Sequence, residues 1–311
     1  MSNKDWIKVF APATIGNIGP GFDVLGLAVS GWGDIIEARK IDSGVVISEI
    51  ESRHDLPTDP DKNTAGIAAR EVLRVLREDG GVEMKIRKGL PSGSGLGSSA
   101  ASAAAAAFAV NYLYGEKLSK EDLILPATKA EEYVSGAFFA DNTAPCLLGG
   151  ATLTRSKLPL DVTKIGHIDN LHIILVTPDV VILTREAREI LPKTVPMEGF
   201  VNNMANSCLI SAAFAKNDYD LFARSLHDIV IEPVRAKLIP GYQEAKANAL
   251  RAGADGVAIS GSGPTLFAIT SFSHKRSYLI EDALVRSFKK NGIACTSLIT
   301  TVDLEGTRLA D

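Results

Sequence analysis

The sequence predicts a protein of mixed helices and strands arranged in two parts. In the first third of the 311 residues, short β-like runs alternate with glycine-rich turns, at residues 7–10, 35–38 and 45–50. Apolar and charged residues alternate from Val82 to Ile86, which predicts a half-buried strand that runs into a glycine loop and an alanine-rich helix. The composition changes around Ser156 to Asn170, so we divide the chain into two domains, residues 1–155 and 156–311.

Further elements follow from the spacing of apolar residues. A recurring apolar face predicts a helix at 64–77 in the first part, and in the second part helices at 183–191, 202–216, 221–229, 242–252 and 277–291. Apolar runs predict strands at 172–177, 257–260 and 266–270. Helices and strands therefore occur in both parts of the chain.

The composition excludes several classes of function. A net charge of −4 and a pI near 5.8 leave no basic surplus for a phosphate backbone, so nucleic acid is not an expected partner. The three cysteines lie far apart without a CxxC pair, which favours a reducing cytoplasm over a disulfide framework. No apolar run approaches the roughly 18 residues that a membrane span requires. We expect a cytoplasmic protein that is not bound to a membrane.

The string GSGLGSSAAS predicts a phosphate-binding loop. Its glycines remove side chains where backbone N–H groups must approach a bulky anion, at Gly93, Gly95 and Gly97. Ser98 and Ser99 are natural caps for the helix that begins there, and a helix start offers unpaired N–H donors and partial positive charge. We expect Lys88, just upstream, to support the phosphates.

Other interpretations of the loop are less satisfactory. A flexible linker is disfavoured, because Leu96 and the strong helix former from Ala100 to Val110 indicate an ordered turn. A Rossmann fingerprint started at Gly93 meets Ser98 in its third glycine place, and one started at Gly95 lacks a suitably placed acidic residue. No GxxxxGK followed by Ser or Thr occurs, which excludes a Walker loop.

Six segments in order resemble the galactokinase, homoserine kinase, mevalonate kinase and phosphomevalonate kinase (GHMP) family, and within it the homoserine kinases. The three longest are PATIGNIGPGFDVLG, GLPSGSGLGSSAAS and AISGSGPTLFAI, at residues 12–26, 89–102 and 258–269. The others are ADNTAPCLLGG, TREAREILP and PVRAKLIPGY, at residues 140–150, 184–192 and 233–242. Together they span nearly the whole chain.

This resemblance implies a two-domain α+β fold in which ATP and the acceptor meet in the cleft between the domains. It implies a kinase that phosphorylates the hydroxyl of L-homoserine in threonine biosynthesis, with ATP and Mg²⁺. The nucleotide would be bound by the loop from Pro91 to Ala101, namely Pro91, Ser92, Gly93, Ser94, Gly95, Leu96, Gly97, Ser98, Ser99, Ala100 and Ala101. Ser99 and Glu131 would bind the metal, which suits a cation that takes only one or two protein oxygens.

The acceptor has a carboxylate, an ammonium and a hydroxyl, and the resemblance assigns residues to each. Arg188 and Arg235 would bind the carboxylate, for which the planar guanidinium is well suited because it can form two parallel hydrogen bonds. Three polar side chains would surround the amino end, Asn17, Asp23 and Asp141. Asn142 would face the reacting hydroxyl, and we expect the catalytic residues to be Asn142, Glu131 and Ser99.

Asn142 predicts a mechanism without a dedicated general base. Several relatives have an aspartate near that place, whereas an amide does not accept a proton usefully near neutral pH. Phosphoryl transfer through a loose transition state tolerates this, because alignment and charge neutralisation supply most of the catalysis. The hydroxyl proton could pass to a phosphate oxygen.

One departure concerns the residues before ADN. Homoserine kinases commonly carry a histidine there, whereas this chain has Phe138 and Phe139. The change could alter acceptor preference or provide apolar packing, and we favour packing.

Two other functions stay open. The chain could phosphorylate another alcohol, such as mevalonate or shikimate, although mevalonate has no ammonium for Asp23 and Asp141 to bind. It could also be an inactive relative that binds nucleotide or a protein partner, but Ser99, Glu131 and an intact glycine loop argue against this. We expect a homodimer, the default for soluble enzymes of this size.

Overall fold

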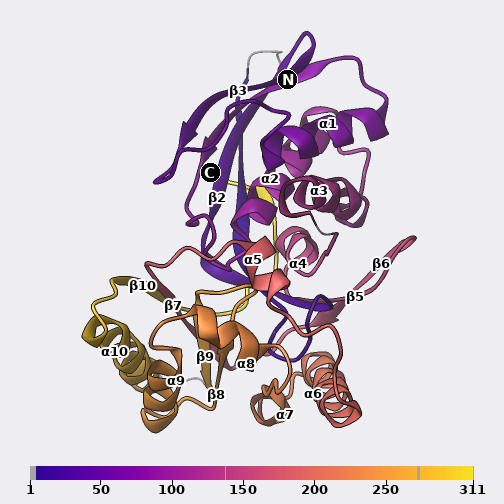
Figure 1. Cartoon of the computed structure of the whole chain (residues 1–311). Coiled ribbons are helices and arrows are strands. Elements are labelled where there is room, and N and C mark those ends of the chain that lie inside the picture. The colour runs from indigo at the N-terminus through magenta and orange to yellow at the C-terminus, as the bar shows by residue number, and fades with distance from the viewer. Residues whose placement is uncertain (1–4, 137, 272–273, 311) are drawn as a thin grey trace.

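The computed structural model describes residues 5–136, 138–271 and 274–310, and it contains two sheets with helices packed against each (Figure 1). The first sheet has the order β11-β1-β2-β4-β3, and β5 pairs with β2 and β6. Its strands are β1 (Ile7–Gly16), β2 (Leu25–Ile41), β3 (Gly44–Glu51), β4 (Gly81–Arg87), β5 (Ala151–Lys157), β6 (Leu160–Gly166) and β11 (Arg308–Leu309). All of these pairs are antiparallel except β3 with β4.

Four helices belong to the first sheet: α1 (Thr64–Leu76), α2 (Ser98–Leu113), α3 (Lys120–Ser135) and α4 (Thr143–Leu148). Helix α2 is central and contacts β1, β2 and the three other helices. Its alanines from Ala103 to Ala107 are fully buried. Because alanine side chains are small, this helix can approach the sheet and its neighbours closely, which fixes the position of the loop before it.

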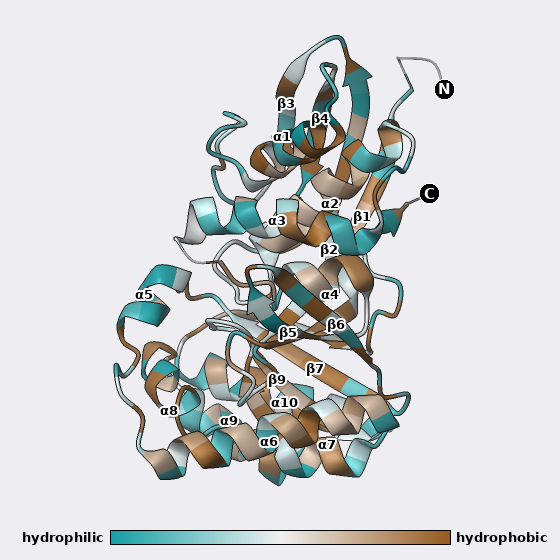
Figure 2. Cartoon of the chain, turned by 90° about the vertical axis from the view of Figure 1, so that its right-hand side faces the viewer, coloured by the Kyte–Doolittle hydropathy of each residue, from teal (hydrophilic) through white to brown (hydrophobic). Residues whose placement is uncertain are grey.

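The second sheet has the order β10-β7-β9-β8 and is antiparallel throughout. Its strands are β7 (Leu171–Pro178), β8 (Gly256–Ile259), β9 (Leu266–Ser271) and β10 (Cys295–Thr300). The remaining elements are α5 (Thr184–Glu189), α6 (Met197–Lys216), α7 (Tyr219–Ser225), α8 (Glu232–Arg235), η1 (Ala236–Leu238), α9 (Tyr242–Arg251) and α10 (His274–Lys290). Figure 2 shows β7 as a mostly hydrophobic strand, and all eight of its residues are buried, including the polar His172.

Alternate residues of β7 pack into two cores. Ile173 and Leu175 belong to the larger core, which also contains the interior of the first sheet. Ile174 and Val176 face the opposite way, into the smaller core formed with α9 and α10. The larger core therefore joins the two sheets. Among the described residues, no helix is both long and apolar enough to cross a lipid bilayer.

The structure confirms the predicted helices and strands and corrects several bounds. The helix expected at 221–229 ends at Ser225, and the one expected from residue 202 begins at Met197. Strand β2 is much longer than expected because its glycines resemble turns in the sequence. At Gly33 a Cβ would lie 2.3 Å from the Ala11 carbonyl oxygen, so this glycine permits close strand pairing rather than a turn.

The strands on both sides of residue 155 belong to one sheet. Strand β5 pairs with β2, and β6 continues the sheet beyond the expected division. The chain also returns to this sheet at its C-terminal end, through β11. The division into residues 1–155 and 156–311 stays a prediction.

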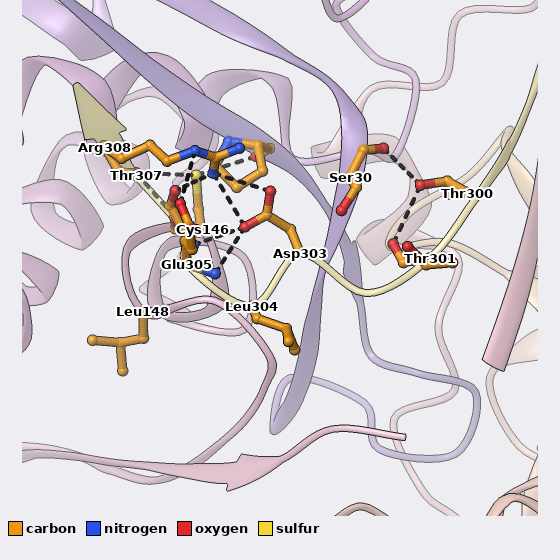
Figure 3. Close-up of polar contacts among 12 residues, drawn as sticks. Ser30, Cys146, Leu148, Thr300, Thr301, Asp303, Leu304, Glu305, Thr307 and Arg308 are labelled. Atoms are coloured by element: carbon orange, nitrogen blue, oxygen red, sulfur yellow. Dashed lines mark hydrogen bonds and ion pairs between the residues drawn. The ribbon is translucent and has the colours of Figure 1, made fainter. Parts of the chain in front are cut away.

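The C-terminal segment holds α4 in place (Figure 3). Thr307 donates two hydrogen bonds to the Cys146 carbonyl oxygen, from its backbone N–H at 2.8 Å and from its hydroxyl at 2.9 Å. Asp303, which is buried, accepts from the backbone N–H groups of Glu305 and Gly306 and from Nη1 of Arg308. This segment thereby fixes the helix that follows Asp141 and Asn142.

Replacing Asp303 should destabilise the protein. Asp303→Ala leaves two backbone N–H groups and a guanidinium without their acceptor, so we expect the free energy of unfolding to fall by about 3 kcal/mol. Glu305→Ala is the matched control, because its carboxylate is exposed and pairs with the same arginine; it should change stability by less than about 0.5 kcal/mol. Urea denaturation measures both, and equal losses would contradict this account.

Candidate active site

A cavity of about 490 Å³ lies where several of the six strings singled out in the sequence meet. It is lined by the glycine loop, by Asn17 and Asp23 of the N-terminal segment, by the start of α1, by Glu131 of α3, and by residues of α5 and the 261–262 loop. Asp141, Asn142, Arg188 and Arg235 also face it. Both halves of the chain thus contribute walls to one cavity.

Hydrogen bonds to backbone carbonyl oxygens connect the three longest strings. The Thr14 N–H donates to the Leu96 carbonyl oxygen at 3.1 Å, which ties β1 to the glycine loop. The Ser260 hydroxyl donates to the Gly95 carbonyl oxygen at 2.7 Å, and Asn17 Nδ2 donates to the Gly261 carbonyl oxygen at 2.9 Å. The loop after β8 therefore binds both the glycine loop and the N-terminal segment.

The glycine loop has the geometry expected of an anion site. Gly93, Gly95 and Gly97 have positive φ angles of 68°, 79° and 65°, in the left-handed region that favours glycine. Helix α2 begins at Ser98 after Gly97, and no side chain caps its first turn. The amide groups of that turn are the orphan donors of a helix start, and Ser92, Gly93, Ser94, Gly95, Gly97, Ser98 and Ser99 line the cavity.

Some predicted features of the loop differ in the structure. Leu96, Ala100 and Ala101 are fully buried and do not line the cavity, and Pro91 faces a smaller cavity of about 270 Å³ nearby. The serines do not cap α2 as expected. The Ser98 hydroxyl donates to the Leu90 carbonyl oxygen at 3.0 Å, and the Ser99 hydroxyl donates to Glu131.

The expectation that Lys88 supports the phosphates stays a prediction: Lys88 lines the cavity, but its ammonium group is engaged by protein partners. It forms a buried ion pair with Asp34 and donates to the Ser98 carbonyl oxygen at 2.6 Å and to the Ser102 hydroxyl at 2.8 Å. These contacts use all three donors of the ammonium. Asp34 also accepts from the Gly89 N–H at 3.1 Å. The buried ion pair of Lys88 and Asp34 therefore fixes the position of the glycine loop.

Ser99 and Glu131 lie together at the end of the loop. The Ser99 hydroxyl donates to Glu131 Oε2 at 2.9 Å, and Oε1 of the same carboxyl group is buried. Burial raises the pKa of Glu131 to about 7, while the Ser99 hydrogen bond and the charge of Lys88 act in the opposite direction. A bound divalent cation would compensate for this burial, so two adjacent hard oxygen donors beside an anion site fit Mg²⁺.

Asn142 is oriented by Thr14. The Thr14 hydroxyl donates to Asn142 Oδ1 at 2.8 Å, and Asn142 lines the cavity. Two glycines make room for the amide group: a Cβ at Gly16 would lie 2.8 Å from Asn142 Nδ2, and one at Gly97 would lie 2.1 Å from Thr14 Oγ1. The sequence analysis missed Thr14, although it lies inside the PATIGN string.

The predicted acceptor residues also come together. Arg188 and Asp23 form a two-point ion pair, with Nη1 and Nη2 donating to the carboxylate at 3.1 and 2.9 Å. Arg188 Nε is buried and has no hydrogen-bond partner within the described part of the chain. Arg235 is buried and donates to the Gly261 carbonyl oxygen at 2.7 Å, and burial lowers its pKa to about 10, so it stays charged near neutral pH.

Asp141 is buried beside this ion pair. Burial, followed by the negative charge of Asp23, raises the pKa of Asp141 to about 7, against a hydrogen bond from the backbone of Asn17 and the charges of Arg235 and Arg188. Near neutral pH this carboxyl group is therefore divided between its acidic and ionised forms. A ligand cation at this place would favour the ionised form.

Binding of an ammonium ligand should therefore depend on pH. The folded-state pKa of Asp141 is raised, so the carboxylate that an ammonium requires forms as pH increases through about 7. We expect the KM of an amino-acid acceptor to fall about tenfold from pH 6 to pH 8. Asp141→Asn should remove this dependence. Initial rates at saturating Mg·ATP measure it, and a KM that stays constant with pH in the unmutated protein would contradict the assignment.

The cavity is also lined by residues that the sequence analysis did not select as site residues. They are Leu56, Pro57, Lys62, Asn63, Thr64 and Ile86. The Asn63 side chain accepts from the Ala65 N–H and caps α1. The only signal in the sequence was this Asn-Thr pair at the start of the predicted helix, because none of the six strings includes these residues.

Comparisons with known proteins agree with this arrangement. The GHMP kinases N terminal domain matches residues 63–150, and the GHMP kinases C terminal domain matches residues 210–291. A homoserine kinase of Methanococcus maripaludis is 43% identical over 270 residues, which cover 86% of this chain and 89% of the relative. A homoserine kinase of Arabidopsis thaliana is 41% identical over 98% of this chain and 85% of the relative.

A solved structure gives the same result for the fold. The crystal structure of homoserine kinase from Cytophaga hutchinsonii aligns with a TM-score of 0.94 at 41% identity, covering 100% of this chain and 99% of that one. The similarity extends through both sheets and the cavity between them. This chain belongs to the homoserine kinases of the GHMP kinase family.

Proposed function

We propose that this chain transfers the γ-phosphoryl group of ATP to the hydroxyl of L-homoserine, giving O-phospho-L-homoserine and ADP. The observation that supports this most strongly is the single cavity that joins an anion-binding loop to a set of paired charges. A nucleoside triphosphate fits the anion-binding loop, and a zwitterionic amino acid fits the paired charges. The reaction belongs to threonine biosynthesis.

In this proposal the loop from Pro91 to Ala101 binds the nucleotide. The amides around Gly95 and the first turn of α2 hold the phosphate oxygens, while the base lies toward Asn63. Ser99 and Glu131 hold Mg²⁺, which neutralises charge on the phosphates when bound. The buried Lys88 and Asp34 pair keeps the amides aimed at the phosphates.

The acceptor is oriented by the charged residues of the opposite wall. Arg188 and Arg235 bind its carboxylate, and Asn17, Asp23 and Asp141 surround its ammonium. Asn142 then faces the hydroxyl, where its amide NH₂ group can donate a hydrogen bond to the acceptor oxygen. Because this amide accepts no proton, alignment of hydroxyl and γ-phosphate carries the reaction, and the proton leaves with a phosphate oxygen.

The charge pattern favours a zwitterion over other alcohols. Asp23 and Asp141 have a counterpart in the homoserine ammonium but none in mevalonate, shikimate or galactose. An acceptor without an ammonium would desolvate these carboxyl groups without giving them a partner, which disfavours its binding.

A coupled ADP-release assay tests the proposal. With Mg·ATP and a panel of homoserine, mevalonate, shikimate and galactose, we expect turnover with homoserine to exceed turnover with the others by at least about 10², the discrimination that unpaired buried charges provide. Turnover with mevalonate or shikimate instead would identify another alcohol kinase. ATP binding without turnover on any acceptor would identify an inactive relative.

We further propose a cytoplasmic homodimer. The three cysteines are free thiols, which suits a reducing compartment. Helix α6 exposes an apolar face that suits a subunit contact, formed by Met197, Phe200, Val201 and Met204. Light scattering after size-exclusion chromatography would give twice the chain mass if the dimer forms, and the mass of one chain if it does not.

A further inference from the structure

We propose that Phe139 is a positioning residue for the acceptor, which acts by holding the guanidinium group of Arg188. This inference rests on the proposed function, because it concerns the same acceptor-binding wall. Phe139 lines the cavity and comes directly before the Ala140–Asp141–Asn142 string.

The ring of Phe139 contacts two cations. The Arg188 guanidinium carbon lies 4.1 Å from the ring centroid, and Lys157 Nζ lies 4.0 Å from it. Both distances are within the range in which the negative face of an aromatic ring attracts a positive charge. Phe139 therefore does more than pack against apolar groups, which was the favoured explanation of this residue.

Arg188 needs such support because of where it lies. It is in α5, a helix of six residues with a single buried side chain, Ala187. Its guanidinium reaches from the second half of the chain to Asp23 of the first half, and it lies only partly buried. A long side chain on a short helix loses considerable conformational freedom when it is fixed, so each additional contact improves its alignment.

The three contacts restrict different movements of the guanidinium. Asp23 binds its end through two hydrogen bonds, which fixes the direction of the group. Phe139 covers the guanidinium at 4.1 Å, and Phe22 lies farther away at 5.3 Å. Nε stays without a hydrogen-bond partner among the described residues, so Arg188 retains a donor that Asp23 does not use. Loss of the Phe139 ring would leave the ion pair with Asp23 in place but allow the Arg188 guanidinium group to tilt.

This arrangement separates acceptor binding from phosphoryl transfer. The ring of Phe139 contacts the cations of Arg188 and Lys157, whereas Ser99 and Glu131, which would hold the metal, bind each other. The role of Phe139 should therefore be visible in the KM of homoserine. The KM of ATP and the kcat at saturating acceptor should change little.

Steady-state kinetics of the full chain test the inference. Phe139→Leu removes the aromatic face while keeping an apolar side chain, and we expect it to raise the KM of homoserine about tenfold. Phe139→Trp keeps a strong aromatic face in a different shape and should retain a KM within about threefold of the parent. Phe138→Leu is the matched control at the adjacent phenylalanine, and it should behave as the parent does.

A double-mutant cycle then shows whether the effect passes through Arg188. In an Arg188→Met background, Phe139→Leu should raise the KM of homoserine by less than about twofold, because the group that the ring holds is gone. An undiminished increase in that background would overturn the inference, as would a KM of Phe139→Leu within twofold of the parent. A loss of activity shared by the Leu and Trp variants would also overturn it, because this would indicate packing alone.

The outcome is distinguishable from failure of the proposed function. If the unmutated chain releases no ADP with homoserine, the proposed function fails, and this inference fails with it. If the unmutated chain turns over homoserine and the variants match it, only the role of Phe139 is rejected.

Discussion

Glu131→Gln is expected to lower kcat by on the order of 10² or more while the protein stays folded, because one carboxylate charge is lost where the metal would bind. Glutamine has the same shape and can still accept the Ser99 hydrogen bond of 2.9 Å. Burial raises the pKa of Glu131 to about 7, so its charged form is costly in the folded protein. The neutral variant should therefore have an equal or higher melting temperature.

A lower kcat together with an equal or higher melting temperature distinguishes the loss of a metal ligand from a loss of folding. Glu132→Gln is the matched control, because it makes the same chemical change at the next residue of α3, where the side chain is exposed. Its kcat and melting temperature should match those of the parent. A Glu131→Gln protein with unchanged kcat at saturating magnesium would remove Glu131 from the active site.

Gly97→Val is expected to abolish tight ATP binding, with a loss of at least about 10² in affinity, equivalent to roughly 3 kcal/mol. The first added carbon would lie 2.1 Å from Thr14 Oγ1 and 3.1 Å from Asn142 Oδ1. The backbone φ of +65° is also strained for a β-branched residue. The substitution therefore disturbs both the amides that hold the phosphates and the hydrogen bond that orients Asn142.

Gly292→Val separates the two causes. Its φ of +73° imposes similar backbone strain, but no atom lies within 4 Å of the added carbon, and residue 292 lies outside the cavity lining. It should lower stability without changing nucleotide affinity. Titration with a fluorescent ATP analogue measures both variants, with circular dichroism as the check on folding. If folded Gly97→Val binds the analogue as tightly as the parent, the loop does not hold the phosphates.

The sequence predicted the parts of the fold and site that depend on local patterns. Alternating residues from Val82 to Ile86 indicated β4, and the glycine and serine string indicated the loop before α2. The convergence of three distant strings on one cavity followed from the resemblance alone. Periodicity contains no information on which strands meet across a chain of this length, so the two sheets and the shared core could not be derived from it.

Side-chain partners were the hardest feature to predict. Lys88 was expected to contact a phosphate, but its ammonium group forms a buried ion pair with Asp34, which is 54 residues away in the sequence. Thr14 orients Asn142 across 128 residues, and Asp23 binds Arg188 across 165. Such pairs depend on tertiary packing, which a single sequence does not reveal. Most of the predicted site residues line one cavity, although Pro91, Leu96, Ala100 and Ala101 do not, and their mutual contacts required the structure.

Identification of the product is the most direct test of the central claim. Phosphorus NMR of a reaction containing the chain, Mg·ATP and L-homoserine should show loss of the γ-phosphate signal with equal gain of a phosphomonoester signal. Mass spectrometry should assign that species to O-phospho-L-homoserine. Release of inorganic phosphate alone, or an ATP spectrum that does not change when homoserine is added, would contradict the account.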